Sequence, residues 1–318
     1  MSTAKRWSAT FRKRWIAAGC IMPGCSGPEG VGKATFAFRA ARRLLGAPLD
    51  ETYGLLGSSP DHPVSRQVSA RSHPDLMVLE REVEGGKARK VIPVDEARKL
   101  PEFFSKSPSS APYRVAIVDA VDDMNANAAN ALLKTLEEPP ERGVLFLISH
   151  APGGLLPTIR SRCRRLRFAP WEEVEVADFV AAHAGANAED SIRLSRMSGG
   201  APGRALDLLA RKALAADDAA HELLSGLPEL DRGSIQQLAD GFRGAEGMAK
   251  FELLMERLAD QIRHMAAAAV ARGDPPSERW AQTWSRLVDL PREVEGLNLD
   301  RADAFWTVIA DLRAAARG

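Results

Sequence analysis

The first half of the chain contains two near-continuous apolar runs rich in β-branched residues, YRVAIVDA at 113–120 and GVLFLISH at 143–150. Apolar runs without alternation are typical of strands that are buried on both faces of a sheet. Between them, residues 125–140 have helical spacing, with Asn125 or Asn127 as the N-cap and a Pro-Pro pair at the end. Strand, helix and strand in this order predict a parallel sheet with right-handed crossovers.

Weaker patterns predict, in order, an amphipathic helix, a polar loop with one helical turn, a strand and a turn. Their ranges are 36–46, 47–74, 75–80 and 84–90. A further helix is expected within 91–108, capped by Asp95 and broken or kinked at Pro101.

The pattern changes after Pro170, where helical segments separated by Gly and Pro continue almost to the end of the chain. Apolar stripes at helical spacing are expected to form core in this part. Their members are Phe251, Leu254, Met255, Leu258, Ile262 and Met265, and then Trp280, Trp284 and Leu287. The chain is therefore predicted to comprise an α/β domain at 1–168, a small helical part at 169–213 and a helical C-terminal domain at 214–318.

Residues 25–35, CSGPEGVGKAT, match the phosphate-binding pattern G-x-x-x-x-G-K-[ST] except at one position. Gly27, Gly32 and Lys33 keep the backbone cradle and the cation that contact a phosphate chain. Ala34 replaces the hydroxyl that ligates Mg²⁺, and Thr35 lies one residue further, rotated by roughly 100° around the helix. Two alternatives stay open here: a loop that contacts nucleotide, and a loop kept only for its shape.

A second candidate residue is Asp119, at the carboxyl end of a predicted buried strand, where such sheets bind their ligands. A strand-end aspartate can hold Mg²⁺ through water. The next position, where many such ATPases carry a water-activating glutamate, is Ala120, and Asp122 and Asp123 are expected to be solvated turn residues. Without the metal hydroxyl and the glutamate, we do not expect this chain to hydrolyse ATP alone.

Five arginines lie within residues 158–168, TIRSRCRRLRF. They are Arg160, Arg162, Arg164, Arg165 and Arg167. Most are expected to lie on a solvated strand edge, where charges prevent pairing with another chain. A guanidinium held rigidly on such an edge can instead reach a neighbouring protein's ATP as an arginine finger.

Composition excludes several other classes of protein. The net charge is only +1, so no strong overall field points to nucleic acid or to a membrane surface. No apolar run approaches the roughly 18 residues that a membrane helix requires. The three cysteines form neither a paired framework nor a C-x-x-C metal set. The N-terminus is basic, but its apolar part, WIAAGC, is short and runs straight into the phosphate loop, so we expect a cytoplasmic protein and not an exported one.

Taken together, several stretches resemble the delta-prime subunits of bacterial DNA polymerase III clamp loaders, which are members of the AAA+ family. They are GPEGVGKAT, SHPDLMVLE, VAIVDAVDDMNANAANALLKTLEEPP, LISHAPGGLLPTIRSRC and SGGAPGRAL. Because LLKTLEEPP and SRC are shared with the gamma/tau motor subunits, the features that favour delta-prime are Ala34 and Ala120. The resemblance covers the α/β part and the helical part after it, and it is weak in the C-terminal helices.

The resemblance implies an AAA+ α/β module, a helical lid and an all-α collar that holds a ring of subunits. It implies that Arg162 is an arginine finger offered to the ATP site of an adjacent gamma/tau subunit, and that Arg204 occupies the second-sensor position. The degenerate nucleotide site would comprise Gly27, Gly30, Gly32, Lys33, Thr35, Asp119 and Arg204. Such a subunit would be a non-hydrolysing stator that requires no cofactor and binds ATP or ADP weakly at most. Its partners would be gamma/tau and delta, and through the complex the sliding clamp and primed DNA, with no membrane.

One departure from the resemblance concerns zinc. Clamp-loader relatives often carry a four-cysteine zinc module between the first helix and the HPDL strand. Residues 47–74 contain no cysteine, and His62 and His73 alone cannot build a structural site. We therefore expect no zinc.

A second departure precedes the phosphate loop, where relatives carry an apolar strand resembling Leu-His-His-Ala-Trp-Leu-Leu. This chain has GCIMPGCSG, with Pro23 and Gly24 where a central strand needs N–H donors and side chains. The codons GGC-TGC-ATC-ATG-CCT-GGC-TGC-TC would encode residues 19–25 and, read two bases later, give that apolar run. We hypothesise that residues 1–26 are read in a shifted frame, and codons in the genomic DNA that cannot yield the run would refute this.

Two other functions stay open at this stage. An active ATPase motor of the gamma/tau type would have to use Thr35 and Asp122 as substitutes for the missing groups. A stand-alone phosphate- or DNA-binding protein would have to act with a net charge near neutral.

Overall fold

The computed structural model describes residues 23–81, 83–84, 87–88, 91–138, 140–151, 153–275 and 277–317. They form two compact units. The first comprises the described residues up to Phe179 together with Ser198–Arg204, and the second comprises Val180–Met197 and the chain from Ala205 onward. The predicted helical part at 169–213 contributes to both units, and its boundaries stay a prediction.

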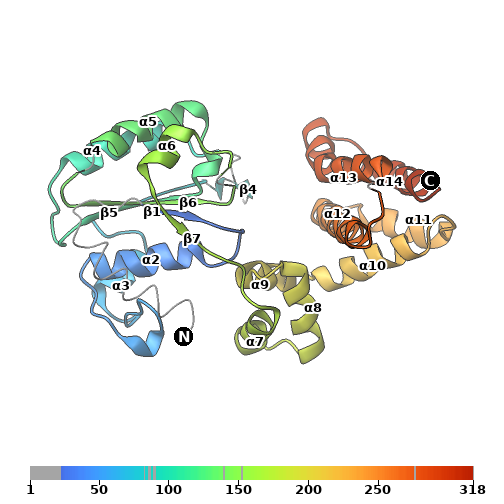
Figure 1. Ribbon diagram of the computed structural model, residues 1–318, viewed down its shortest axis with the longest axis horizontal. Coiled ribbons are helices and arrows are strands. Elements are labelled where there is room, and N and C mark those ends of the chain that lie inside the picture. Colours follow the sequence, from blue (N-terminus) through green and yellow to red (C-terminus); the bar gives the residue numbers. More distant parts are fainter. Residues whose placement is uncertain are drawn as a thin grey trace. The chain divides into compact units, whose positions relative to one another are not determined.

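The first unit is built on a five-stranded sheet whose neighbouring strands are all parallel, in the order β2-β5-β6-β1-β7 (Figure 1). The strands are β1 (Pro23–Ser26), β2 (Leu76–Glu80), β5 (Arg114–Asp119), β6 (Gly143–Ser149) and β7 (Arg164–Arg167). The parallel sheet and the two doubly buried strands are confirmed, since every residue of β6 is buried. A small hairpin, β3 (Val83–Glu84) and β4 (Lys87–Ala88), lies where a turn was predicted.

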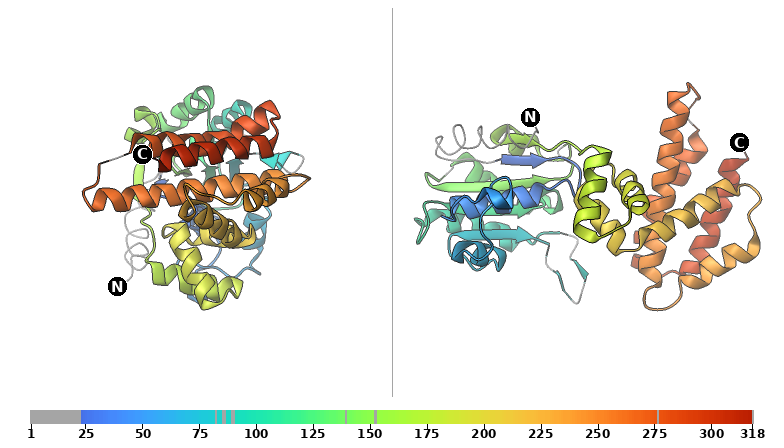
Figure 2. Two further views of the ribbon diagram at one scale, coloured as in Figure 1. Left: turned by 90° about the vertical axis from the view of Figure 1, so that its right-hand side faces the viewer. Right: turned by 90° about the horizontal axis from the view of Figure 1, so that it is seen from below.

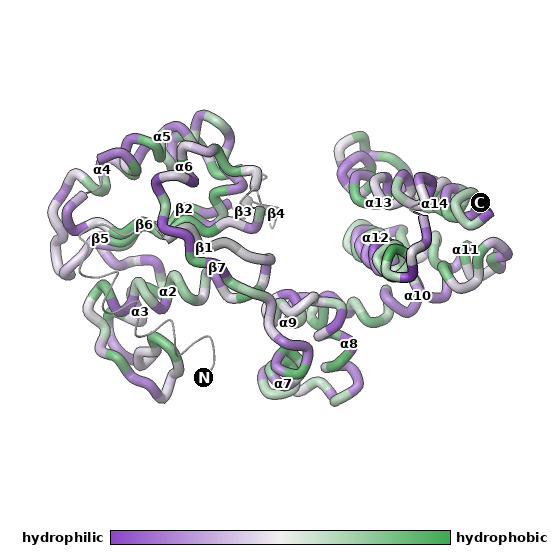
Figure 3. The backbone as a smooth tube through the Cα atoms, viewed as in Figure 1, coloured by the Kyte–Doolittle hydropathy of each residue, from purple (hydrophilic) through white to green (hydrophobic). Residues whose placement is uncertain are grey.

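Helices cover both faces of this sheet (Figure 1), and the view from below in Figure 2 looks onto the face that carries α2 (Lys33–Leu44) and α3 (Pro63–Ser69). The other face carries α4 (Val94–Ser105), α5 (Ala126–Glu137) and α6 (Pro157–Arg162). Because side chains alternate along a strand, Val115 and Ile117 of β5 belong to the core under α2, whereas Ala116 and Val118 belong to the core under α4 and α5. The green colour in the middle of β5 and of β6 in Figure 3 marks the apolar residues that are buried on both faces.

Short turns and caps complete the first unit. Two 3₁₀ turns, η2 (Glu51–Tyr53) and η3 (Val121–Asp123), follow α2 and β5. Asn125 caps α5 by accepting a hydrogen bond from the Ala128 N–H at 2.9 Å, which decides between the two predicted caps. The prediction for α4 was wrong in its cap: the N-cap is Pro93, and Asp95 lies inside the first turn. The helix also continues unbroken through Pro101 to Ser105.

Residues 158–168 do not form one strand edge, so the predicted placement of Arg160 and Arg162 on a strand was wrong. Pro157 opens α6 at the position that prolines favour in a helix, and Ile159 is 1% exposed in the core beside α5. Strand β7 begins only after Cys163 and lies at the end of the sheet order. Its exposed arginines, as predicted for the edge, are Arg164, Arg165 and Arg167.

The segment before the phosphate loop is described only from Pro23 onward, so residues 1–22, which carry most of the frame-shift hypothesis, lie outside the described residues. Pro23–Ser26 forms β1, and this short strand pairs with both β6 and β7. Pro23 is its first residue, a position where a strand tolerates a missing N–H.

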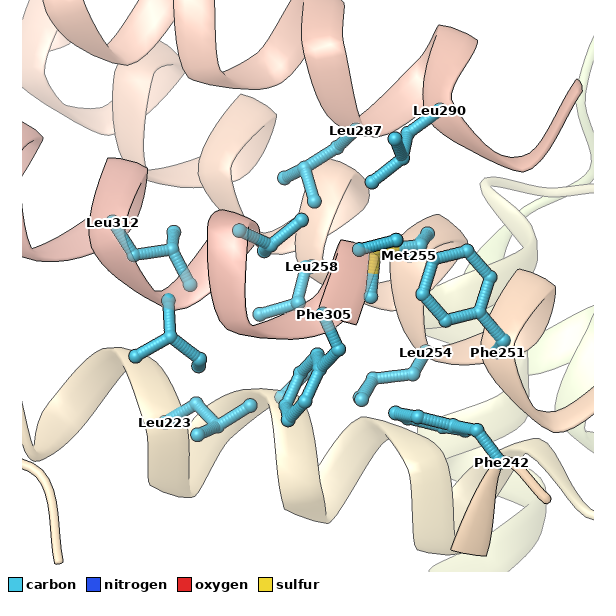
Figure 4. Packing of buried hydrophobic residues seen from close by; sticks show 14 of the residues in the cluster. Leu223, Phe242, Phe251, Leu254, Met255, Leu258, Leu287, Leu290, Phe305 and Leu312 are labelled. Atoms are coloured by element: carbon cyan, nitrogen blue, oxygen red, sulfur yellow. The ribbon is translucent and has the colours of Figure 1, made fainter. Parts of the chain in front are cut away.

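The second unit is helical, and its main core surrounds three phenylalanines, Phe242, Phe251 and Phe305 (Figure 4). Phe242 makes edge-to-face contacts with the other two, at centroid distances of 5.4 and 5.1 Å. The helices after residue 170 are α7 (Glu173–Ala184), α8 (Ala188–Ser198), α9 (Pro202–Ala210), α10 (Ala213–Ser225), α11 (Arg232–Gly241), α12 (Gly247–Ala271), α13 (Glu278–Leu297) and α14 (Arg301–Ala316). None of the helices that the structure describes is both long and apolar enough to cross a bilayer.

The predicted apolar stripes are buried in part. On α12 the stripe is buried from Phe251 to Ile262, whereas Met265 is 46% exposed. On α13 Leu287 is buried, but Trp284 is 40% exposed. The buried face of α13 also includes Thr283, a polar residue that an apolar pattern does not select.

Candidate functional site

The sheet topology brings the phosphate loop and the carboxyl ends of β2, β5 and β6 to one edge, because parallel strands place their carboxyl ends together. A pocket of about 460 Å³ opens there. Its lining residues are Glu29, Gly30, Gly32, Lys33, Ala34, Thr35, Glu80, Arg81, Asp119, Ala120, Asp123, Ile148, His150 and Gly203. Of the residues predicted for a nucleotide site, the pocket therefore unites Gly30, Gly32, Lys33, Thr35 and Asp119.

Lys33 begins α2 and is only 3% exposed. Its Nζ donates hydrogen bonds to the carbonyl oxygens of Gly27 and Pro28, each at 2.5 Å. The Lys33 ammonium group thus binds the backbone of its own phosphate loop.

The loop glycines are required by close backbone contacts. At Gly30, where φ is +77°, a Cβ would lie 2.4 Å from the Arg204 backbone N, and at Gly27 a Cβ would lie 2.4 Å from the Phe168 carbonyl oxygen. The Gly203 N–H donates to the Gly30 carbonyl at 2.8 Å. The first turn of α9 therefore rests directly on the phosphate loop. Arg204 contributes its backbone to this contact, while Gly203 lines the pocket.

Acidic side chains outnumber basic ones in the pocket lining. The carboxylates are Glu29, Glu80, Asp119 and Asp123, and the cations are Lys33 and Arg81. Two of these carboxylates are already paired: Asp123 Oδ2 lies 3.1 Å from Arg81 Nε, and Glu80 forms an ion pair with Arg71. Burial raises the pKa of the Asp119 carboxyl above its ordinary range, and the neighbouring Asp123 and Glu29 add to this against the opposite effect of His150 and Lys33.

Asp122 has a structural role, so its prediction as a solvated turn residue was wrong. Its carboxylate accepts hydrogen bonds from Ser149 Oγ at 2.9 Å, from the His150 N–H at 2.6 Å and from the Ala151 N–H at 3.3 Å. The side chain thereby joins η3 to the carboxyl end of β6.

The residues present do not fit a hydrolytic Mg-ATP site. Methyl groups of Ala34 and Ala120 occupy the two positions where a metal ligand and a water-orienting carboxylate belong. Thr35 lines the pocket and is exposed, and it carries the hydroxyl nearest in sequence to the missing one.

Sequence reasoning missed His150, which follows β6 and lines the pocket. Its buried Nδ1 finds no hydrogen-bond partner among the described residues. The available signal was its position directly after a strand that adjoins the strand of Asp119, which places both at the same edge.

Arg162 is the last residue of α6, and its side chain is 36% exposed. Its Nη2 lies 3.0 Å from Glu137 Oε1, and its Nη1 donates to the Thr158 carbonyl at 3.0 Å. The guanidinium is thus on a helix end at the surface of the first unit.

The two histidines of the segment 47–74 hold local turns. His62 Nδ1 accepts from the Val64 N–H at 3.3 Å, and His73 Nδ1 accepts from the Asp75 N–H at 3.1 Å. Within the described ranges no three His, Cys, Asp or Glu side chains are grouped so that they could hold a metal ion. The absence of zinc stays a prediction.

Several known proteins are similar to this chain. The family described as DNA polymerase III, delta subunit, matches residues 3–172. DNA polymerase III subunit delta' of Pseudomonas aeruginosa is 41% identical over 137 residues, which cover 43% of this chain and 39% of that protein. The subunit of the same name from Escherichia coli is 30% identical over 210 residues, which cover 66% of this chain and 61% of that protein. DNA polymerase III subunit tau of Bacillus subtilis is 34% identical over 145 residues, which cover 45% of this chain and 23% of that protein.

The match to the family extends over more than half of the chain, although the aligned parts span less than two thirds of the length of these relatives. The resemblance to delta-prime subunits inferred from the motifs is confirmed by these matches. The chain belongs to the DNA polymerase III, delta subunit family.

Proposed function

We propose that this chain is a non-hydrolysing subunit of a DNA polymerase III clamp-loader complex, and that it supplies Arg162 to the ATP site of a neighbouring subunit. Its membership of the family and its similarity to proteins named delta' and tau support a place in that assembly. The partners would be gamma/tau and delta subunits in the cytoplasm. Through the complex the chain would help to place the sliding clamp on primed DNA, as part of the polymerase holoenzyme.

The observation that carries the proposal is the pair of methyl groups in the pocket, at Ala34 and Ala120. A hydroxyl at the first position would ligate Mg²⁺, and a carboxylate at the second would orient the attacking water. Losing either group typically costs orders of magnitude in rate, so the loss of both supports a subunit without turnover of its own.

The contacts of the phosphate loop also disfavour a tightly bound triphosphate. Lys33 donates to the Gly27 and Pro28 carbonyls, so phosphate oxygens would compete with these two bonds for the ammonium group. Any nucleotide binding at this loop would therefore be weak.

An active motor of the gamma/tau type is the second candidate, and the position of Thr35 in the pocket favours it. Asp122, the other substitute that such a motor would need, already accepts three hydrogen bonds from the end of β6. The motor would therefore have to act without a free carboxylate from that residue.

Turnover by the purified chain separates the two candidates. With Mg-ATP and primed DNA we expect no hydrolysis above background, and the Lys33→Ala variant should give the same result. Turnover at the rate of a clamp-loader motor that disappears in Lys33→Ala would overturn the proposal.

The finger assignment is tested in the complex reconstituted with tau- and delta-type subunits. Arg162→Ala should leave assembly intact. It should lower the DNA-stimulated ATPase rate of the complex by the fraction of turnover that comes from the one ATP site to which Arg162 is supplied. At that site the loss should be large, because arginine fingers contribute about 10³–10⁵ in rate. An unchanged rate would remove the assignment.

A further inference from the structure

Arg162 is held in a folded-back position by two contacts within its own subunit. Its Nη2 lies 3.0 Å from Glu137 Oε1, and its Nη1 donates to the carbonyl of Thr158, one turn earlier on α6, at 3.0 Å. Both terminal nitrogens of the guanidinium therefore already have a partner inside the chain.

The platform under this ion pair is rigid. Leu132 and Leu136 of α5 are buried in the same core cluster as Ile159 of α6. The partly buried Cys163 packs against this cluster. Glu137 ends α5 and Arg162 ends α6, so the pair links the ends of two helices that are packed together. The separation of the two helix ends is consequently set by the core and not by the ion pair.

Recognition of a phosphate by arginine uses two parallel N–H groups in a planar fork. The guanidinium carries five N–H groups, and the bonds from Nη1 and Nη2 hold it against its own subunit through two of them. Phosphate oxygens of a neighbour's ATP would therefore compete with the Glu137 carboxylate and the Thr158 carbonyl for the position of this side chain.

We propose that Glu137 is a parking carboxylate for Arg162: it holds the arginine back in the unengaged subunit and competes with the neighbour's phosphate for it. This inference rests on the proposed role of Arg162 as an arginine finger. Both side chains are partly exposed, 36% for Arg162 and 52% for Glu137, so the pair is weak enough to be displaced by a doubly charged phosphate. Ion pairs of this exposure shift an equilibrium by at most about fivefold.

The test uses the complex reconstituted with tau- and delta-type subunits, and it compares ATPase rates without and with saturating primed DNA. Under this proposal the finger is engaged only part of the time without DNA, so Glu137→Gln should raise the basal rate about two- to fivefold. Saturating DNA would favour the engaged position in both complexes, and the maximal rate should not change. A change in the ratio of the two rates at constant maximal rate is a result that general destabilisation does not produce.

Three variants serve as controls. Glu138→Gln removes the same charge from the adjacent exposed residue and should leave both rates unchanged. Glu137→Asp keeps the carboxylate and should bring the basal rate back toward that of the unmodified complex. In an Arg162→Ala background, Glu137→Gln should have no effect, because there is no arginine to release.

Each other outcome has a definite meaning. If Arg162→Ala lowers ATPase but Glu137→Gln leaves the basal rate unchanged, the parking role is wrong and the finger stands. If Glu137→Gln lowers both rates, Glu137 supports the engaged state and the parking role is again wrong. If Arg162→Ala itself has no effect, the proposed finger fails, and the inference fails with it.

Discussion

Asp75 is fully buried immediately before β2, and its carboxylate accepts hydrogen bonds from the backbone of residues 109–111. The N–H groups of Ser109 and Ser110, each at 2.8 Å, and of Ala111 at 3.1 Å point at its carboxylate, and both serine hydroxyls add to them. Arg114 Nε lies 3.5 Å away. Burial alone would raise the pKa of Asp75, but the hydrogen bonds outweigh it and lower the pKa from 3.8 to about 2.

We predict that Asp75→Asn lowers the free energy of unfolding of the first unit by about 2 kcal/mol or more at pH 7. The amide would turn an NH₂ group toward N–H donors, so part of the backbone at 109–111 would lose its acceptor. Because the folded pKa is depressed, the stabilisation is fully present above about pH 4 and is lost as the pH falls through about 2. Urea denaturation from pH 7 down to pH 2 measures both effects.

The matched control is Asp95→Asn, which changes a carboxylate that is 86% exposed on α4. It should change stability by less than about 0.5 kcal/mol. Equal losses for the two variants would show that the buried hydrogen bonds of Asp75 contribute nothing specific.

Only part of the candidate site was predictable at this scale. Lys33 and the loop glycines follow from a local motif, because a phosphate loop is specified within eight residues. Glu80 ends β2, Arg81 follows it, and His150 follows β6. Only the order of the strands in the sheet brings these residues to the pocket. The sequence also does not show that the Lys33 ammonium group already donates hydrogen bonds to the backbone of its own loop.

Helix α5 is the element that carries Glu137, and its start is fixed by one side chain. Asn125 accepts from the Ala128 N–H at 2.9 Å, whereas Asn127 lies exposed inside the first turn. We predict that Asn125→Ala lowers the free energy of unfolding by about 1 kcal/mol, as expected for the loss of an N-cap.

Asn127→Ala is the control, because it removes the same side chain two residues later without touching the cap. Alanine has the higher helix propensity, so stability should be unchanged or rise by a few tenths of a kcal/mol. Thermal denaturation of both variants measures the difference. A loss at Asn127 equal to that at Asn125 would mean that the cap is not what holds the helix start.

Elements with long apolar runs were predictable, and short or charged ones were not. β5 and β6 follow from their sequences alone, because strands buried on both faces need continuous apolar residues. The boundary between α6 and β7 lies inside a run of arginines. Ile159 and Leu166 are buried, and they alone indicate which face of each element packs into the core. Pro101 inside α4 shows the same limit, because tertiary packing of Leu100 and Phe104 holds the helix against its local preference.

At the scale of the whole molecule, the second unit carries apolar side chains that its own core does not cover. Trp284 and Val288 of α13 are 40% and 46% exposed. They lie four residues apart, and therefore about 40° apart around the helix, so they share one face. Under the proposed function this face would contact a partner subunit, since an exposed aromatic next to an aliphatic residue is typical of the centre of an interface.

We predict that the double variant Trp284→Glu with Val288→Glu weakens co-purification with tau- and delta-type subunits more than tenfold and abolishes clamp loading. Two carboxylates buried at an interface without partners cost well over 1.4 kcal/mol, the equivalent of a factor of ten. Leu297→Glu is the matched control: Leu297 is 71% exposed and lies nine residues after Val288, about 180° around α13. All variants should keep the helical content of the unmodified chain. Equal loss of binding in Leu297→Glu, or full clamp loading by the double variant, would place the partner contact elsewhere on the chain.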